Sequence, residues 1–541
     1  MGCSLLPLFL FLFTATLSIA APLFQQAPIS GGEGVGVGGG LVPLRRFAAE
    51  DTSTPVRNTS FILAAQRTLR KDPTDGFKLY NGGWNISEGH YWASVGFTAF
   101  PLFTLAIVWF VGFGLTLLLI CCCYCCCPRR SYSYSRVAYA LSLILLILFT
   151  IAAIIGCIVL YTGQGKFHSS TSETMDYVTG QADFTVENLR NFSGDLSAAK
   201  KVGVDQVFLP ADTRAKIDEI VTKVNASANK LDARTSDNSN KIKDVLNTVR
   251  MILVVVAAVM LLLAFLGFLL SIFGLQSIVY ILVFVGWILV AGTFILCGVF
   301  LIFHNVVADT CVSMEEWVEN PTEQTALDDI LPCVDVATAN ASFYQSKLTT
   351  FQLVNVVNQV ITNVANRNIP PALGPPLYYN QSGPLMPTLC NPYNSDLSNH
   401  TCTAGQVGLS NASQVWQGFV CTASMVSGAE VCTSVGRITP NIYKQMDAAV
   451  SMSFGLHHYG PFLAQLEDCT FVRQTFSDIS ANNCPGLRKY SYWIYVGLAM
   501  VSAAVMLSLI FWVIYARERR HRRYNKESKV MVQDKGGFER M

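Results

Sequence analysis

The chain has 541 residues, of which 51% are hydrophobic and only 14% are charged, and its mean hydropathy is +0.39. Soluble globular proteins rarely have this composition. The formal net charge of +2 provides no extended basic surface for a phosphate backbone, so we expect no nucleic-acid partner.

The N-terminal segment has the pattern of a secretory signal. Residues 1–20 combine an apolar run with small residues at Ser18 and Ala20, which predicts a signal peptide cleaved near Ala20. No Lys or Arg precedes the apolar run, so an uncleaved anchor remains the alternative. An outer N-terminal segment, 21–92, follows, and its Gly-rich part from Gly31 to Gly40 is typical of a flexible tether.

Five later stretches are apolar and long enough to cross a bilayer, which takes about 20 helical residues. They are residues 93–120, 137–161, 251–273, 278–303 and 491–515. Only residues 274–277 separate the third stretch from the fourth, which predicts a tight helical hairpin with a cytoplasmic turn.

The positions of Lys and Arg predict the orientation of these spans, since short cytoplasmic loops are enriched in them. The loop 121–136 carries three arginines and the tail 516–541 begins with a basic run, so we expect both to be cytoplasmic. The mature N-terminus and the loops 162–250 and 304–490 are then outside. We expect a multi-pass protein that reaches the plasma membrane through the secretory pathway.

Asn-x-Ser/Thr motifs give a second reading of the topology, because they are glycosylated only on the lumenal side. All eight motifs fall in segments predicted to be outside. The candidate residues are Asn58, Asn85, Asn191, Asn225, Asn340, Asn380, Asn399 and Asn411.

Cysteines fall into two groups with different expected chemistry. Eight lie in the second outer loop, where an even number predicts up to four disulfides with 105 possible connectivities. These are Cys311, Cys333, Cys390, Cys402, Cys421, Cys432, Cys469 and Cys484. A zinc site is disfavoured because no CxxC spacing occurs among them.

The other group lies at the inner end of the first span, beside Pro128 and two arginines. Juxtamembrane cysteines near basic residues are typical acceptors for palmitoylation. The candidates are Cys121, Cys122, Cys123, Cys125, Cys126 and Cys127. The alternative is that they only extend the apolar span.

The first outer loop has a coiled-coil-like pattern. Its seven-residue lattice comprises Ile217, Val224, Leu231, Val245 and Ile252, is interrupted at Asn238, and is widened by Ile220 and Val221. No Pro or Gly lies between Pro210 and the third span, so one continuous helix is predicted to run into that span. About 60 Å of this helix would project outside the membrane. The nearest partner is the segment of Val186, Leu189, Phe192 and Leu196.

The second outer loop also has a helical pattern, with apolar residues every three or four positions. They are Tyr344, Leu348, Phe351, Val354, Val357, Ile361 and Val364, a predicted buried helix face that Ile369-Pro370-Pro371 ends. A further helical stretch is predicted at about 441–480. The expected fold class is an all-α multi-pass membrane protein, with five transmembrane helices and a helical, disulfide-stapled extracellular bundle.

Motifs for catalysis are not found: the sequence has no Walker loop, GxSxG, HExxH or dinucleotide fingerprint, so we expect no enzyme and no cofactor. His457 and His458 are adjacent and make a poor metal pair, so no metal site is expected. The five spans contain no Asp, Glu, Lys, Arg or His, which disfavours a proton-driven carrier. Tyr91, Trp92, Tyr490, Tyr492 and Trp493 are predicted interfacial anchors.

The basic run after the last span is explained by topology alone, and contact with anionic lipid is a second reading. Its candidate residues are Arg517, Arg519, Arg520, Arg522 and Arg523.

The order of these segments, with the CCCYCCCPRR block after the first span, resembles the prominins. Tweety proteins have a similar five-span layout, and fungal mating-fusion proteins share large helical outer loops. More closely, the chain looks like a plant family of multi-span proteins labelled plasma membrane fusion proteins. The resemblance implies a protein that organises curved membrane, protrusions, vesicles or membrane contact, binds sterol and associates with itself, although its outer loops are shorter than those of prominins.

Three hypotheses remain at this point. The first is a non-enzymatic plasma-membrane organiser whose partners are membrane lipids, including sterol and anionic lipid, and further copies of itself. The second is a tweety-like anion channel. The third is a cell-surface adhesion or receptor protein with an unknown extracellular partner.

Overall fold

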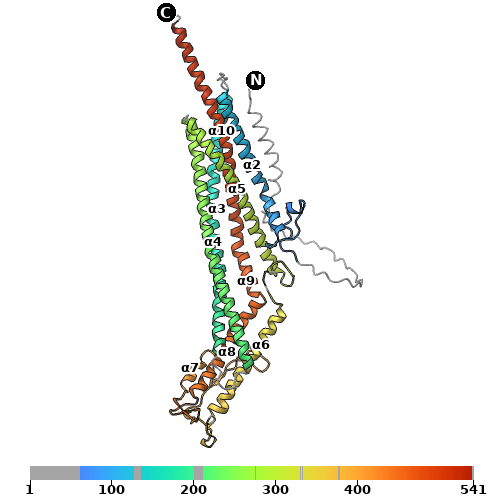
Figure 1. Ribbon diagram of the computed structural model, residues 1–541, viewed down its shortest axis with the longest axis vertical. Coiled ribbons are helices and arrows are strands. Elements are labelled where there is room, and N and C mark those ends of the chain that lie inside the picture. Colours follow the sequence, from blue (N-terminus) through green and yellow to red (C-terminus); the bar gives the residue numbers. More distant parts are fainter. Residues whose placement is uncertain are drawn as a thin grey trace, which may run out of the picture. The chain divides into compact units, whose positions relative to one another are not determined.

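The structure, a computed structural model, describes residues 61–126, 136–199, 211–273, 276–328, 330–331, 333–375 and 378–538. The predicted signal peptide at 1–20 and the tether at 31–40 lie outside them. Helices dominate (Figure 1). The α-helices are α2 (Gly89–Cys126), α3 (Arg136–Ala199), α4 (Ala211–Phe273), α5 (Gln276–Glu319), α6 (Val336–Val360), α7 (Ala412–Gln417), α8 (Pro440–Glu467), α9 (Thr470–Asp478) and α10 (Cys484–Phe538).

Short elements join these helices. The strands are β1 (Lys71–Asp72), β2 (Lys78–Leu79), β3 (Thr388–Leu389), β4 (Gln406–Val407), β5 (Ala423–Val426) and β6 (Ala429–Cys432). The short helical turns are η1 (Pro73–Asp75), η2 (Ile361–Ala365), η3 (Pro371–Leu373) and η4 (Ile479–Asn483). The described chain is therefore not all-α: it contains three two-stranded sheets, β1-β2, β3-β4 and β5-β6.

The chain divides into two compact units. The first comprises Met1–Thr171, Leu246–Leu327 and Ser480–Met541, and the second comprises Ser172–Val245 and Asp328–Ile479. Helices α3 and α4 contribute residues to both.

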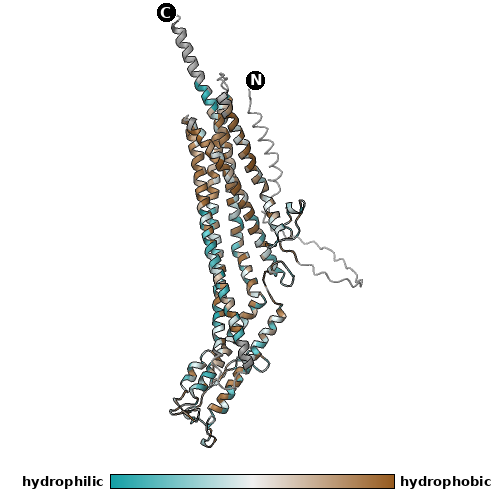
Figure 2. Ribbon diagram, in the orientation of Figure 1, coloured by the Kyte–Doolittle hydropathy of each residue, from teal (hydrophilic) through white to brown (hydrophobic). Residues whose placement is uncertain are grey.

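Five helices are long and apolar enough to cross a membrane by length and composition. Their candidate segments are Gly89–Ile120, Arg136–Ser197, Asp218–Phe273, Ile278–Glu319 and Thr470–Arg520. The prediction of five long apolar helices is confirmed in this sense. Figure 2 shows that α3 and α4 are apolar over one part of their length and polar over the rest.

Helix α10 is the most enclosed of the five helices, with half of its apolar window buried. Glycines let its neighbours approach it closely, since a side chain at these positions would collide. Gly156 of α3 faces Val501, Gly267 of α4 faces the ring of Trp512, and Gly286 of α5 faces Leu509. Trp512 and Leu509 are fully buried as a result.

Helix α2 packs on α5 through aromatic side chains. Trp109 Nε1 donates to the carbonyl of Trp287 at 3.2 Å, and Trp287 Nε1 donates to the carbonyl of Phe110 at 3.0 Å. The Trp287 ring lies against Gly114 and stacks on Phe110. Gly114 is thus a packing position.

In the second unit, α6 and α8 share a buried core. Thr439 caps α8, which begins with Pro440 at its first turn, and Asp335 caps α6. The core contains Val354, Val357, Ile361, Met386, Leu389, Trp416, Ile438, Met446 and Val450. The predicted buried face of α6 is wrong at Tyr344, which is 58% exposed, and α6 ends at Val360, before the Pro pair.

The predicted partnership of α3 with α4 is confirmed over part of their length. Val186, Leu189, Phe192 and Leu196 of α3 are buried against Val221, Val224 and Leu231 of α4 and residues of α8. The lattice prediction is wrong at Ile220, Val245 and Ile252, which are 46%, 60% and 46% exposed. These three side chains therefore do not belong to the buried stripe.

Gly267→Ala tests the packing of α10. The added Cβ would lie 2.0 Å from the Trp512 ring, so we expect a loss of about 1–3 kcal/mol of stability, the usual cost of overpacking. Thermal unfolding of the full chain in detergent measures this. Gly112→Ala is the matched control, because no atom lies within 4 Å of its Cβ, and it should match the native chain or exceed it slightly. Equal melting temperatures for the two variants would contradict the packing described.

Candidate functional site

A buried carboxylate organises the part of the first unit where α5 continues past the predicted fourth span. Asp309 is fully buried. Arg70 forms a bidentate pair with it, Nη1 to Oδ2 and Nη2 to Oδ1, both at 2.8 Å. Arg67 Nε lies 2.8 Å from Oδ1, and the Tyr91 hydroxyl donates to Oδ2 at 3.0 Å. A buried charge requires such partners, and here every one comes from residues 61–91.

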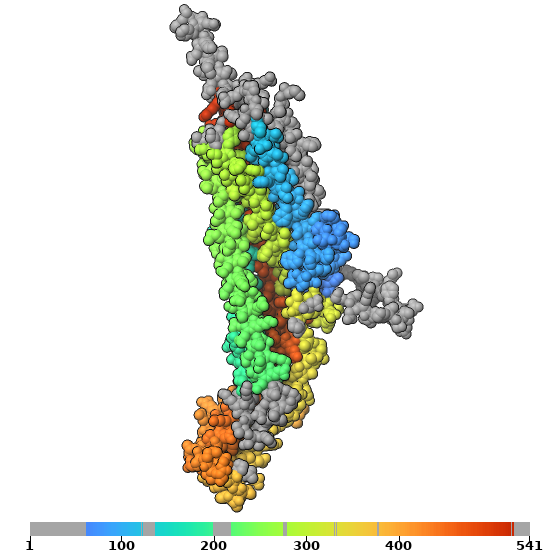
Figure 3. All heavy atoms as spheres, viewed as in Figure 1, coloured from blue at the N-terminus to red at the C-terminus, as the bar shows by residue number. Residues whose placement is uncertain are grey.

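Further bonds attach residues 61–88 to α5 and to the loop that follows it. The Phe61 amide donates to the Gln324 carbonyl at 2.8 Å, the Ala64 amide donates to a carboxylate oxygen of Glu316, and Trp84 Nε1 donates to Thr310 Oγ1 at 3.0 Å. Figure 3 shows this segment, in blue, as a compact block beside α5. We call residues 61–88 the N-terminal block.

The block also has its own internal fastening. Asp72, which is buried, caps η1 by accepting from the Thr74 amide at 2.8 Å, and its other oxygen lies 2.6 Å from His90 Nδ1 at the start of α2. The hydrogen bonds from Thr74 are the main cause that lowers the pKa of Asp72, and the contacts with His90 lower it further. The block is therefore attached to α2 as well as to α5.

The charge around Asp309 is not balanced. Burial lowers the pKa of Arg67, Asp309 opposes that effect, and Arg70 and Arg488 lower it further. Arg67 and Arg70 thus share one carboxylate, and Arg488 is close enough to act on Arg67 electrostatically.

A disulfide fixes the helices that carry this cluster. Cys311, two residues after Asp309, is bonded to Cys484 at the start of α10. Nearby, His304 Nδ1 and Ser491 Oγ lie 2.9 Å apart and join the same two helices. A covalent bond and a side-chain contact thus join α5 to α10 next to Asp309.

Beside the cluster lies an open hollow of about 790 Å³ between the N-terminal block and α5. Its walls include one cation, two carboxylates and apolar side chains: Arg67, Glu316, Glu323, Phe61, Ile62 and Val312. A volume of this size accommodates a small molecule.

Sequence reasoning did not find this site. The signals were an aspartate just beyond an apolar span and two arginines three residues apart in the N-terminal segment, and neither is specific. Tyr91 was predicted to be an interfacial anchor, and that prediction is wrong: its ring is fully buried because its hydroxyl bonds Asp309. Trp92, Tyr492 and Trp493 remain exposed.

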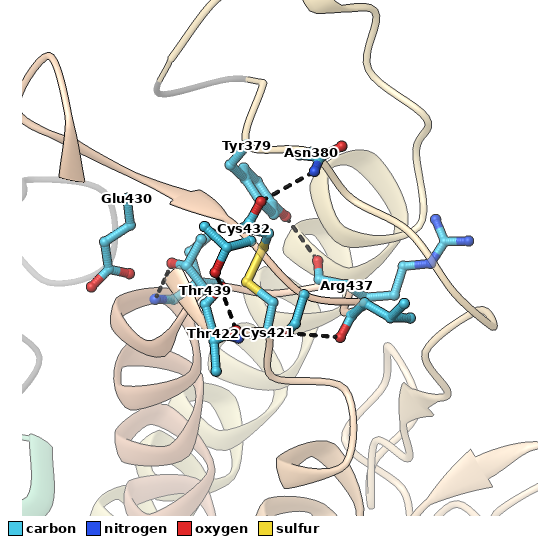
Figure 4. Close-up of a disulfide and its surroundings, with 12 residues drawn as sticks. Tyr379, Asn380, Cys421, Thr422, Glu430, Cys432, Arg437 and Thr439 are labelled. Carbon is cyan, nitrogen blue, oxygen red and sulfur yellow. Dashed lines mark hydrogen bonds between the residues drawn. A yellow bond between two sulfur atoms is a disulfide. The ribbon is translucent and has the colours of Figure 1, made fainter. Parts of the chain in front are cut away.

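The eight cysteines between residues 311 and 484 form four disulfides, as the sequence predicted. The structure selects one connectivity: Cys311–Cys484, Cys333–Cys469, Cys390–Cys402 and Cys421–Cys432. Figure 4 shows the last pair, which closes the β5-β6 hairpin. Arg437 is nearby (Figure 4) and is only 7% exposed. Its side chain donates to the carbonyls of Gly383 and Pro384, and its own carbonyl accepts from the Tyr379 hydroxyl at 3.0 Å.

The predicted acylation sites lie at the end of α2, which continues as helix through Cys126. Cys122 is exposed, and Cys127 lies outside the described residues. Acylation of the group stays a prediction.

The glycosylation candidates differ in how available they are. Asn191, Asn340, Asn399 and Asn411 are exposed, Asn85 and Asn225 are half-buried, and Asn58 lies outside the described residues. Asn380 is exposed, but its side-chain amide donates to the Cys432 carbonyl at 3.1 Å (Figure 4).

The tail arginines make contacts within the protein. Arg519 donates to the carbonyls of Ser271 and Ile272 at the end of α4, Arg520 donates to the Tyr280 hydroxyl at 3.2 Å, and Arg522 lies over the Tyr139 ring. A cation at a helix C-terminus is favourable. Arg517 and Arg523 are exposed, and lipid contact by the run stays a prediction.

The paired histidines diverge as expected. His457 Nδ1 lies 2.9 Å from the Tyr393 hydroxyl, whereas His458 is exposed and stacks on Phe454. Within the described part of the chain, no group of three His, Cys, Asp or Glu residues could hold a metal ion.

Comparison with known families gives one partial match. The family model described as the DDB_G0292058-like C-terminal domain matches residues 106–369, slightly less than half of the chain. The match begins within α2, includes all of α3 to α6, and ends before η3. The chain matches no curated protein.

Asp309→Asn tests the cluster. The substitution preserves size but leaves two arginines without their anion, and breaking a buried pair typically costs about 3–5 kcal/mol. We expect faster amide exchange across the N-terminal block, measured by hydrogen–deuterium exchange of the full chain. Asp75→Asn is the control, since its pair with Lys78 is exposed and contributes at most about 1 kcal/mol. Unchanged exchange in Asp309→Asn would show that other contacts hold the block.

Proposed function

We propose that the chain is a five-span integral membrane protein, without enzymatic activity, that organises the surface membrane through its outer helical parts. In this proposal it reaches the plasma membrane by the secretory pathway, with its N-terminus outside and its tail in the cytoplasm.

One observation carries the membrane part of the proposal. In the first unit, large apolar side chains point outward along α2 to α5, while among the described residues of α10 only Tyr492 and Trp493 are exposed large hydrophobics. A soluble monomer rarely exposes a continuous apolar surface of this extent. The outward residues include Ile107, Leu115, Leu118, Ile144, Leu148, Ile151, Ile155, Ile158, Val255, Leu262, Phe265, Ile281, Phe284, Ile288 and Ile295.

The organising role rests on what continues from the apolar segments. Helices α3 and α4 have 64 and 63 residues, about three times the length that a span requires. Their polar parts belong to the second unit, which three disulfides stabilise. A protein built in this way presents a firm outer structure on membrane helices, which suits contact with other copies or with neighbouring surfaces.

The channel hypothesis has less support. The interior of the first unit is filled around α10 by side chains such as Leu146, Leu160, Val505 and Leu509, each fully buried. Close packing of this kind favours a scaffold over a conducting path within one copy. Adhesion or receptor function is compatible with the disulfide-stabilised second unit.

The distribution of the protein on the cell surface tests the organising role. We expect a tagged full chain to be enriched on protrusions and shed vesicles relative to flat membrane, because a scaffold with outer self-contacts concentrates where it shapes the surface. Immunogold electron microscopy measures this. An even distribution would contradict the proposal, and a chloride-dependent current that appears with the protein would favour the channel instead.

The lipid part of the proposal has its own test. Replacing the six cysteines of 121–127 by Ser should remove acyl labelling and shift the protein away from its native lateral distribution, since each buried acyl chain adds membrane affinity. The control variant replaces Cys157 and Cys297 by Ser. Both cysteines are buried in the first unit, so this variant should retain the acyl label. A native distribution for the six-cysteine variant would remove acylation from the proposal.

A further inference from the structure

The hollow between the N-terminal block and α5 has opposite charges on its walls. Arg67 supplies a guanidinium, while Glu316 and Glu323 supply carboxylates. A ligand with a single charge would gain at one wall and be repelled at the other. A ligand that carries both charges a few ångströms apart can satisfy both walls.

The cationic wall has donors to spare. Arg67 Nε lies 2.8 Å from Asp309 Oδ1, and the Arg67 side chain is 30% exposed. Among the described residues its two terminal amino groups have no other partner, so they can donate a forked pair of hydrogen bonds, the geometry that phosphate oxygens accept. Arg70 and Arg488 add positive charge that Asp309 alone does not neutralise.

The acidic wall also has capacity. One oxygen of Glu316 accepts from the Ala64 amide, which fixes the carboxylate and leaves its second oxygen available. Glu323 is exposed. Two carboxylates that line the same hollow suit an ammonium group.

Apart from Gln66, which is polar and uncharged, the rest of the lining is apolar. Phe61, Ile62 and Val312 contribute hydrocarbon surface, and Ile62 remains 43% exposed. Such surface suits the methylene or methyl groups that join or surround a charged pair. The volume of about 790 Å³ exceeds what an inorganic ion needs and fits a small organic group.

We infer that this hollow binds a zwitterionic phosphodiester headgroup of the phosphocholine or phosphoethanolamine class, with the phosphate at Arg67 and the ammonium at Glu316 and Glu323. The inference builds on the proposed membrane placement, because the hollow lies beside the part of α5 that follows the predicted fourth span. The same chemistry occurs in an outer-leaflet lipid and in a free soluble headgroup.

Calorimetric titration of the full chain in a phosphate-free sugar detergent tests the chemistry. The probes are glycerophosphocholine and glycerophosphoethanolamine, with inorganic phosphate and choline chloride as single-charge probes. We expect saturable binding of the two zwitterions and at least tenfold weaker binding of phosphate or choline alone. Equal binding of all probes, or no binding of the zwitterions, would overturn the inference.

Variants assign the two walls. Arg67→Gln should weaken glycerophosphocholine at least tenfold, and so should the double variant Glu316→Gln with Glu323→Gln. Because Arg67→Gln also loosens the block, Glu323→Gln alone serves as the variant that leaves the block attached, and it should weaken the zwitterion several-fold while leaving phosphate unchanged. Lys78→Gln is the control, since Lys78 is an exposed cation of the same block outside the hollow. Native affinity in Glu323→Gln and in the double variant would remove the acidic wall and overturn the inference.

Retention of lipid identifies the source. Native mass spectrometry of the chain released from bilayers of phosphatidylcholine should show bound lipid that Arg67→Gln loses, and phosphatidylglycerol should be retained less. Binding of the soluble headgroup without lipid retention would support the same site with a free phosphodiester as its ligand. The titration in detergent tests only the headgroup site, so its failure would not contradict the organising role. An even surface distribution would contradict the organising role and would leave the result of the titration unchanged.

Discussion

The close approach of α10 to its neighbours is the constraint on which the first unit depends. A helix in the middle of a bundle must lie near several others at once, and glycine at the points of contact makes this possible. The Trp512 ring occupies the space that a side chain at Gly267 would need, and Gly156 and Gly286 serve the same purpose on α3 and α5. Because α10 is the most enclosed of the five helices, most of the large apolar side chains that face outward belong to the surrounding helices.

A second constraint acts where the apolar packing ends. Asp309 cannot be buried alone, and its partners come from residues far away in the sequence, which fold over α5 for that reason. The same cluster lies next to Cys311, whose bond to Cys484 joins α5 to α10. The ion pairs of Asp309 and the disulfide of Cys311 thus stabilise the same part of α5. The hollow with its opposite charges forms because the N-terminal block is held against α5 there. The proposed headgroup site uses a guanidinium that Asp309 holds in position.

Local patterns in the sequence were informative where one neighbour decides the outcome. The apolar runs predicted five long helices, and the α3 residues from Val186 to Leu196 were correctly assigned as the partner of α4. The patterns misled where several neighbours decide. Val245 continues the α4 lattice and Tyr344 continues the α6 face, yet both are exposed, and Tyr91 lies at the end of a span yet is withdrawn to bond Asp309.

The sequence by itself determined the composition of each segment: which helices are apolar, where cations lie at their ends, and that eight cysteines fall in one loop and six in another. These properties follow from residue type and spacing within a single stretch of chain. Only the tertiary structure decided which cysteines pair, which glycines receive a tryptophan or leucine, and that Arg67, Arg70 and Tyr91 converge on Asp309. Each of these joins residues that are distant along the chain, and no local pattern encodes such a distance.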